Sequence, residues 1–478
     1  MNPGIPRLTA GLPPGGLPLT AFEEHMLADD RPTHPMVITM RLDFDGPPPL
    51  GPLTAAFEAT LRNEPLLTAR VRRPRSGRPR WVAGEPPRLL FSSLDEVAGE
   101  DDSWPGVPPL VDAAHGPVLQ AEIVTRPQGW VLLLAVHHAA ADGLGIVSFV
   151  ERWLLAASGR ETSQRRQAGS GNLARRGRVA ASWWAFVRML PGLTSGIQGV
   201  RQFMGRRVIS IRGPADPAAS SPANAVGPSC PWRPEVVTIT LDETEVSDLE
   251  QRERTLGVTA NDLLVAAYVA ALGEMHAGLP DGADDGWIRI GVPMSLRTKT
   301  DYGLPAANRV SMVFLDRRPA DRHDHESLVG GIHAEMDLIR SHELGHIFPL
   351  TLELGRLLPG GLRRVAERPA PQCTAVLSNL GRCFHRSPLS APDGPPTLGT
   401  SRLTGWWIVP PVRPGTAVAA ATHETAGRRT IALHFDPARL QAVDARRLLD
   451  ATHAALRKTP DGLLVSCHRS PAPARNRP

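Results

Sequence analysis

The feature that most constrains this chain is a histidine pair at the end of an apolar run. Residues 130–136 are Trp-Val-Leu-Leu-Leu-Ala-Val, and residues 137–143 follow as His-His-Ala-Ala-Ala-Asp-Gly. A continuous apolar run of this length predicts a buried strand. Residues 145–157 then have the pattern of a helix. We therefore expect the histidine pair on a strand-to-helix turn, a position better suited to catalysis than to core packing.

The histidine pair is consistent with general-base chemistry. A neutral imidazole can take a proton from an attacking hydroxyl or amine near neutral pH. Neighbouring residues of an extended backbone point in opposite directions, so we expect one of His137 and His138 to face a cleft and the other to pack behind it. Asp142 could pair with an arginine from the other half of the molecule and hold the shape of the turn. Gly143 permits a tight turn and the close approach of a substrate.

The residues alone leave three other interpretations open. The histidines could be structural and hydrogen-bonded to backbone carbonyls. They could bind a metal together with Asp142, although adjacent histidines rarely share one ion and no second cluster with ligand spacing is evident. A serine triad is the third interpretation, and the chain contains no Gly-x-Ser-x-Gly elbow to support it.

Composition indicates a soluble globular protein and argues against nucleic-acid binding. The chain is 42% hydrophobic and 21% charged. Its net charge of +5 comes almost wholly from arginine, because Lys299 and Lys458 are the only lysines, and no nucleic-acid-binding motif is present. Four cysteines without Cys-x-x-Cys spacing suggest free thiols, and neither a signal peptide nor an 18-residue apolar run is found. We expect a cytoplasmic protein.

The chain divides into two regions with mixed strand and helix patterns. We expect a flexible tail over 1–17, an N-terminal subdomain over 18–159, a connecting segment over 160–234, a C-terminal subdomain over 235–466 and a second tail over 467–478. The alternation predicts a mixed α/β fold. Residues 160–212 are rich in arginine and contain tryptophans, so they are either a solvated crossover linker or a contact with an anionic membrane surface.

Secondary structure can be assigned to most of both regions. Strands are expected over 36–42, 66–71, 118–124, 131–136, 236–241, 287–292, 310–315, 374–377, 417–422 and 430–435, and helices over 53–64, 145–157, 263–275 and 440–456. Residues 259–262, Thr-Ala-Asn-Asp, precede the apolar helix at 263–275 and can cap its N-terminus.

His-His-x-x-x-Asp-Gly resembles the hallmark of the CoA-dependent acyltransferase superfamily. Within it, the chain looks most like the bacterial wax ester synthase/diacylglycerol acyltransferase family over nearly its whole length. The segments that carry the likeness, besides the histidine motif, are 18–23, 33–36, 259–264, 292–297, 308–311 and Ser378-Asn379. The resemblance implies two chloramphenicol-acetyltransferase-like subdomains around a central cleft.

The resemblance also implies roles for individual residues. His138 would be the general base that deprotonates a hydroxyl or amine acceptor, which attacks an acyl-CoA thioester directly. Asp142 would be structural and paired with Arg297, while His137 packs behind the turn. Asn379 could donate a hydrogen bond to the oxyanion. Acyl-CoA would be a co-substrate, and no cofactor is implied.

Asn261 and Asp262 match a family motif associated with activity. Simple capping of a helix N-terminus explains the same two residues equally well. Both interpretations stay open at the level of the sequence.

Two departures from the family pattern bear on the substrate. The family often has Pro-Leu-Trp before the histidines, where this chain has Pro-Val-Leu at 117–119, and Ser378-Asn379 continues as Leu-Gly-Arg. A condensation-like tailoring acyltransferase of secondary metabolism is therefore an alternative, with acyl-CoA or an acyl-carrier protein as donor. The Asp-Phe-Gly-Trp-Gly segment of condensation domains is absent. A non-enzymatic scaffold would have no chemical need for His138.

Overall fold

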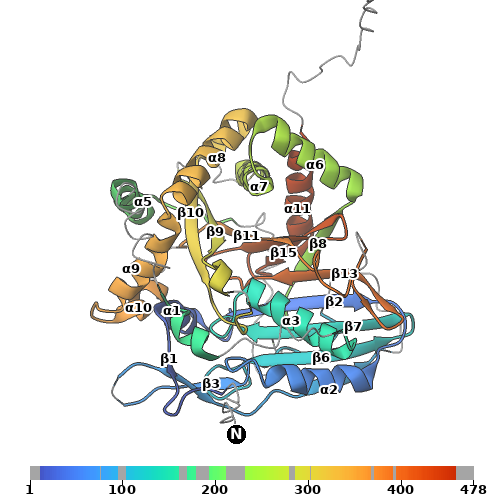
Figure 1. Ribbon diagram of the computed structural model, residues 1–478. Coiled ribbons are helices and arrows are strands. Elements are labelled where there is room, and N and C mark those ends of the chain that lie inside the picture. The colour runs from blue at the N-terminus through green and yellow to red at the C-terminus, as the bar shows by residue number, and fades with distance from the viewer. Residues whose placement is uncertain are drawn as a thin grey trace, which may run out of the picture.

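The computed structural model describes residues 11–458 except 76, 95–103, 161–169, 179–192, 212–231, 279–285, 302, 368–370 and 391–393. Two six-stranded sheets dominate it, one in the lower and one in the upper half of Figure 1, and helices pack on each. This arrangement confirms the predicted mixed α/β class with two sheet-containing subdomains. The predicted tail 467–478 and most of the tail 1–17 lie outside the described residues.

The N-terminal sheet is built around the strand that ends in the histidine pair. Its order is β12-β13-β2-β7-β6-β5. Strand β7 lies in the interior of this sheet and is buried along its whole length, as its continuous apolar sequence predicts. The strands are β2 (Val37–Phe44), β5 (Leu89–Ser93), β6 (Leu119–Arg126), β7 (Gly129–His137), β12 (Thr397–Leu398) and β13 (Ser401–Val409).

Two strands of this sheet come from the far end of the chain. Strand β13 pairs antiparallel with β2, from Leu403 opposite Phe44 to Val409 opposite Thr39. In Figure 1 the orange β13 therefore lies beside the blue β2. The predicted boundaries 235–466 assign β12 and β13 to the C-terminal subdomain, whereas both strands complete the N-terminal sheet.

Helices cover one face of the N-terminal sheet. Helix α2 (Leu50–Leu61) packs against α3 (Gly143–Ala157), and Phe57, Phe149 and Trp153 form an aromatic cluster between them. The same half of the chain forms a small three-stranded sheet with the order β1-β4-β3. The remaining N-terminal elements are β1 (Leu17–Pro18), α1 (Ala21–Asp29), β3 (Ala69–Arg72) and β4 (Arg80–Ala83).

The C-terminal sheet has the order β10-β9-β11-β14-β15-β8. Its strands are β8 (Val236–Leu241), β9 (Ile288–Ser295), β10 (Val310–Arg317), β11 (Ala375–Arg382), β14 (Val418–Thr425) and β15 (Arg428–Phe435). Helices α6 (Glu243–Leu256), α7 (Ala260–Ala277), α8 (His325–Ser341) and α11 (Ala442–Arg457) build its core. Leu263, Leu264 and Tyr268 of α7 are buried there, as the apolar sequence predicts.

Shorter helices connect these layers. Helices α9 (Ile347–Gly355) and α10 (Gly361–Ala366) contact α1 of the N-terminal half. The others are η2 (Ser170–Arg175), α5 (Leu193–Gly205), η4 (Lys299–Asp301), η5 (Pro319–His323) and η6 (Leu344–His346). Of the basic segment 160–212, only 160, 170–178 and 193–211 are described.

The two subdomains share an apolar core. Val131, Leu133 and Ala135 of β7 and Trp407 of β13 belong to one cluster with Ala432 of β15. The N-terminal sheet is therefore covered by helices on one side and by the other subdomain on the other. The end of β7, where the histidine motif begins, consequently lies at the junction of the two subdomains.

Candidate active site

The histidine motif forms a tight turn between β7 and α3. Strand β7 ends at His137, and α3 begins at Gly143. The His138 backbone N–H donates to Met36 O at 2.7 Å, and the Ala140 N–H donates to His137 O at 2.8 Å. The motif therefore occupies the predicted strand-to-helix turn. Backbone hydrogen bonds to the neighbouring segment and within the turn hold it in place.

His137 lies in the core behind the turn. Its side chain is fully buried, its Nδ1 accepts the Ala139 N–H at 3.1 Å, and its Nε2 lies 3.3 Å from Asp30 Oδ2. Because Nδ1 accepts, Nε2 carries the proton that faces Asp30. Burial raises the pKa of Asp30, but the contact with His137 and the Met36 N–H outweigh it and bring the pKa below its usual value.

His138 faces a cavity with one nitrogen free to accept a proton. Its Nδ1 lies 3.2 Å from Ala141 O, so Nδ1 carries a proton and Nε2 has the lone pair. The ring of Phe22 from α1 contacts it edge-on, with 5.7 Å between the ring centroids. Burial is the main cause that lowers the pKa of His138. The imidazole therefore stays neutral, the form that a general base needs.

Asp142 is the structural centre of the turn. As the N-cap of α3 it accepts the Gly145 N–H at 2.8 Å, and it accepts the Arg309 N–H at 2.8 Å. Arg297, the partner implied by the resemblance, donates to both of its oxygens at 2.8 Å. Burial raises the pKa of Asp142, but Arg297 and the backbone donors outweigh it, so the carboxyl group has a lowered pKa and stays ionised.

A loop from the C-terminal half, residues 304–309, holds the outer side of the turn. The Asn308 side-chain N–H₂ donates to His138 O and to Ala139 O, both at 2.8 Å. The loop approaches α3 so closely that a Cβ on Gly145 would lie 3.1 Å from Ala307 O. Below it, the buried carboxylate of Glu64 accepts the Ala306 N–H at 2.6 Å. The turn is thus fixed by both subdomains.

Gly143 provides space next to the cavity. Its φ lies outside the left-handed region, so the turn itself does not require glycine at this position. A Cβ there would lie 3.1 Å from Leu380 Cδ2, closer than is usual for such contacts. A side chain at 143 would therefore require the end of the Leu380 side chain to shift by a few tenths of an ångström.

Two pockets lie next to His138. The larger encloses about 630 Å³, its opening to solvent included, and is lined by His138, Asp142, Gly143, Arg297 and Asn379 together with mostly apolar residues: Ile38, Leu144, Pro293, Ser295, Val310, Ser378, Leu380, Ile408, Pro410 and Ala421. It brings together five of the eight residues that the sequence indicated. These walls come from both subdomains, so the cavity opens between the two sheets.

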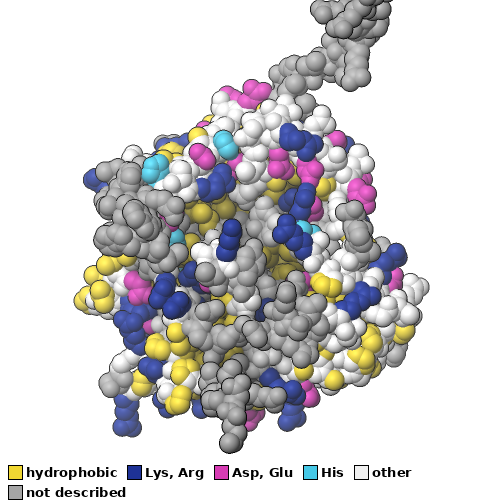
Figure 2. All heavy atoms as spheres, in the orientation of Figure 1, with side chains coloured by type: hydrophobic (Ala, Val, Ile, Leu, Met, Phe, Trp, Pro, Cys, Tyr) yellow, Lys and Arg dark blue, Asp and Glu magenta, His cyan; other side chains and the backbone are white. Residues whose placement is uncertain are grey.

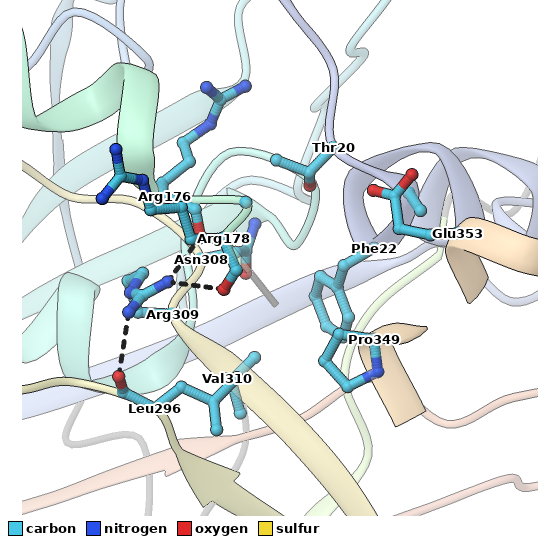
Figure 3. A pocket seen from close by; sticks show the side chains of 12 residues that line it. Thr20, Phe22, Arg176, Arg178, Leu296, Asn308, Arg309, Val310, Pro349 and Glu353 are labelled. Carbon is cyan, nitrogen blue, oxygen red and sulfur yellow. Dashed lines mark hydrogen bonds between the residues drawn. The ribbon is translucent and has the colours of Figure 1, made fainter. Parts of the chain in front are cut away.

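The smaller pocket lies on the Phe22 side of the histidine. It encloses about 370 Å³, its opening included, and shares Val310 with the larger one. Figure 3 shows Arg309 across this pocket from Phe22 and Pro349, and its guanidinium donates to Leu296 O and Arg176 O at 3.0 Å each. The ring of Phe22 lines this pocket and contacts His138, which itself lines the larger one.

Asn379 and the pair Asn261-Asp262 differ in position. Asn379 lines the larger pocket, and its Oδ1 accepts the Gly381 N–H at 2.9 Å, so its N–H₂ group remains for a ligand. Asp262 is buried at the N-terminus of α7, forms a capping box with Thr259 and contacts His333 at 2.8 Å. Neither Asn261 nor Asp262 is among the described residues that line the two pockets. The geometry of Asp262 is that of helix capping.

The sequence did not single out Phe22, Asn308 and Glu64. Phe22 and Asn308 lie within segments 18–23 and 308–311, which carry the family likeness, so a signal was present without a role attached. Glu64 had no such signal. Its importance arises from a contact with Ala306, 242 positions away in the chain.

Three further features concern metal ligands, cysteines and apolar helices. Within the described ranges, no group of three His, Cys, Asp or Glu side chains converges as metal ligands. Cys373 and Cys383 are buried free thiols, whereas Cys230 and Cys467 lie outside these ranges. No single described helix is long and apolar enough to span a membrane, while the bent pair α6–α7 meets that test on length and composition alone.

Comparison with known proteins shows the fold. No family model matches the chain. Two uncharacterized proteins of Mycobacterium tuberculosis are each 26% identical to it over 395 residues, which is 77% of this chain and 83% of theirs.

Solved structures cover nearly the whole chain. The condensation domain of the Monacolin K polyketide synthase has a TM-score of 0.61 at 18% identity and covers 92% of this chain and 96% of its own. The epimerization domain from the third module of tyrocidine synthetase B has 0.61 at 13%, covering 94% and 97%. Polyketide synthase associated protein 5 from Mycobacterium tuberculosis has 0.60 at 16%, covering 92% and 97%. The chain has the condensation-domain fold.

Proposed function

We propose that the protein transfers an acyl group from a thioester directly to a hydroxyl or amine acceptor, with His138 as the general base. The observation that carries the proposal is the state of the imidazole. Its Nδ1 is used by Ala141 O, its pKa is lowered by burial, and its ring lines a cavity between the subdomains. A neutral base with one free lone pair in such a cavity suits proton abstraction.

The reaction needs no acyl-enzyme. His138 Nε2 takes the acceptor proton while the acceptor oxygen or nitrogen bonds to the thioester carbonyl carbon. The resulting tetrahedral oxyanion collapses, the C–S bond breaks, and the imidazolium returns the proton to the thiolate. The N–H₂ group of Asn379 is the candidate donor to the oxyanion, because its Oδ1 is already used by Gly381. No cofactor takes part in these steps.

The first substrate proposal is an acyl-CoA donor with a hydrophobic alcohol or diacylglycerol as acceptor. It rests on the resemblance to wax ester synthase/diacylglycerol acyltransferases and on the lining of the larger pocket. Ile38, Leu144, Leu380 and Ile408 make most of that lining apolar. A long hydrocarbon chain would bury its surface there.

The second substrate proposal is a tailoring acyltransferase that makes an ester or amide from acyl-CoA or an acyl-carrier protein. The similarity in fold to condensation domains supports it. One of these, the starter condensation domain of rhizomide synthetase, has a TM-score of 0.61 at 14% identity and was solved in complex with C8-CoA and Leu-SNAC. Leu380, where the chain departs from the wax ester synthase pattern, contacts the Gly143 position of the histidine turn.

The test is CoA release from palmitoyl-CoA with long-chain alcohols, diacylglycerol and amines as acceptors. We expect acceptor-dependent turnover that falls by roughly 10²–10⁴-fold in His138→Ala. His323→Ala, which changes an exposed histidine that lines neither pocket, is the matched control. Transfer from an acyl-carrier protein alone would favour the second substrate proposal. Activity that survives in His138→Ala would show that the general-base assignment is wrong.

A further inference from the structure

Three leucines at the tip between α9 and α10 are unusually exposed. Leu354, Leu357 and Leu358 have 56%, 74% and 66% of their surface accessible. Figure 2 shows hydrophobic side chains gathered at the left edge of the molecule, where Figure 1 places α9 and α10. We call these three leucines together with Arg363 and Arg364 the α9–α10 tip. Contiguous exposed leucines on a folded chain indicate a contact surface.

Basic side chains flank the leucines. Arg363 is exposed and pairs with Glu367 one helical turn away at 2.6 Å. Arg364 is exposed and makes no hydrogen bond or ion pair with the described residues, and its side chain lies over Gly360. Because Glu367 compensates Arg363, Arg364 is the uncompensated positive charge beside the leucines among the described residues. Apolar side chains next to such a charge complement a surface that has hydrocarbon beneath anionic groups.

The base of the tip is firmly attached to the fold. Leu352 and Leu362 are buried in one small cluster with Ala21 of α1. Arg356 pairs with Glu24 at 3.4 Å and with Glu353 at 3.2 Å. The leucines are thus exposed on a supported projection, so their exposure is not the result of fraying.

A second element adds apolar surface on the same side. Helix α5 begins against α9, since a Cβ on Gly196 would collide with Ile347. Its Val200 and Met204 are exposed, and Figure 1 shows α5 on the side of the molecule where α9 and α10 lie. Part of the basic segment that the sequence indicated as a membrane candidate therefore adjoins α9.

We propose that the α9–α10 tip binds an anionic lipid surface. A stable protein partner needs roughly 800 Å² from each side. Three leucines and two arginines on a projection are far fewer residues than that, whereas a lipid surface needs only shallow insertion with basic side chains at the headgroups. The inference goes beyond the proposed function and stands without it.

The tip also adjoins the smaller pocket. Pro349 and Glu353, both on α9, line the smaller pocket, whose Phe22 contacts the His138 ring. Leu354 follows Glu353 directly in the chain. A lipid surface at the tip would therefore place hydrophobic molecules next to the mouth of this pocket.

The test is co-sedimentation with vesicles of phosphatidylcholine, with and without phosphatidylglycerol, using the full chain. We expect binding to the anionic vesicles that falls at least about tenfold in L354S/L357S/L358S and roughly tenfold in R363Q/R364Q. Leu110→Ser, at a leucine with 72% exposure in the N-terminal half, and R254Q/R457Q, at arginines with 68% exposure on α6 and α11, are the controls that should bind normally.

Folding of each variant is checked by its thermal midpoint, and Leu357→Trp should strengthen binding because tryptophan favours the interface. No binding of the unaltered protein, or equal loss in the control variants, would overturn the proposal. Binding of an acidic acyl-carrier protein at the tip without any vesicle binding would also overturn it. Because no acyl transfer is measured, failure here leaves the proposed function untouched.

Discussion

Arg297 of the C-terminal subdomain contacts both carboxylate oxygens of Asp142 of the N-terminal subdomain, each at 2.8 Å. The carboxylate is nearly fully buried, while the guanidinium keeps some access to solvent. The pair therefore joins the turn that carries His138 to the end of β9. The position of His138 therefore depends on how the two subdomains contact each other.

Loss of either partner should destabilise the protein. We expect Arg297→Ala and Asp142→Ala each to lower the free energy of unfolding by about 2–4 kcal/mol, because each leaves the other charge unpaired. The double variant should lose less than the sum of the two. Arg363→Ala, at the exposed ion pair with Glu367, is the control and should cost under about 1 kcal/mol in denaturant unfolding. Additive losses would contradict a direct coupling.

The rate of acyl transfer should depend on pH through His138. Burial lowers the pKa of His138 below the usual histidine value of about 6.5, so the imidazole stays neutral in mildly acidic solution. As pH falls, kcat/KM should therefore decline with a midpoint below 6.5, when the base becomes protonated. A pH–rate profile between acid and neutral pH measures this midpoint. A value above 6.5 would show that another group controls the rate.

Asn308 should act as a positioning residue. Asn308→Ala removes the donors to His138 O and Ala139 O, and we expect kcat to fall by roughly 10–100-fold with little change in KM. Asn308→Asp should be more harmful, because a carboxylate would face two carbonyl oxygens. Steady-state kinetics compare the two variants. If both variants lost only stability and kept kcat, the positioning role would be refuted.

Two buried histidines should weaken the fold in acid. Burial lowers the pKa of His423 to about 3 and that of His434 to about 4. In the unfolded chain each takes a proton near the usual histidine pKa of about 6.5, so the unfolded state binds more protons below that pH and stability falls as pH falls. His423→Gln should reduce this slope by up to about 1.4 kcal/mol per pH unit. Unfolding of His323→Gln, an exposed control, should keep the full slope.

The sequence correctly predicted the strands and helices whose apolar pattern is uninterrupted. Strand β7 and helix α7 have continuous apolar sequences, and both lie where expected. Strand β13 was not predicted, because Gly405 interrupts its sequence and the pairing with β2 shifts register there. Helix α8 was also missed, since Gly330 and Gly331 lower its helix propensity while Leu328, Val329 and Ile332 are buried by tertiary packing.

The site was predictable where one short motif determines it. His137, His138 and Asp142 take their positions from the local strand-to-helix turn, so spacing sufficed to locate them. Asn308 and Glu64 depend on a loop that returns from the other half of the chain. A pattern within one segment cannot encode such a contact, because it arises only when the two sheets pack together.

The position of β13 beside β2 has a consequence for how this chain can be divided. The eight residues of β2 would lose one of their two neighbours if the chain ended before residue 235. Unpaired N–H and C=O groups along such an edge attract strands of other molecules. We therefore expect a fragment that ends before residue 235 to aggregate rather than fold when it is expressed alone.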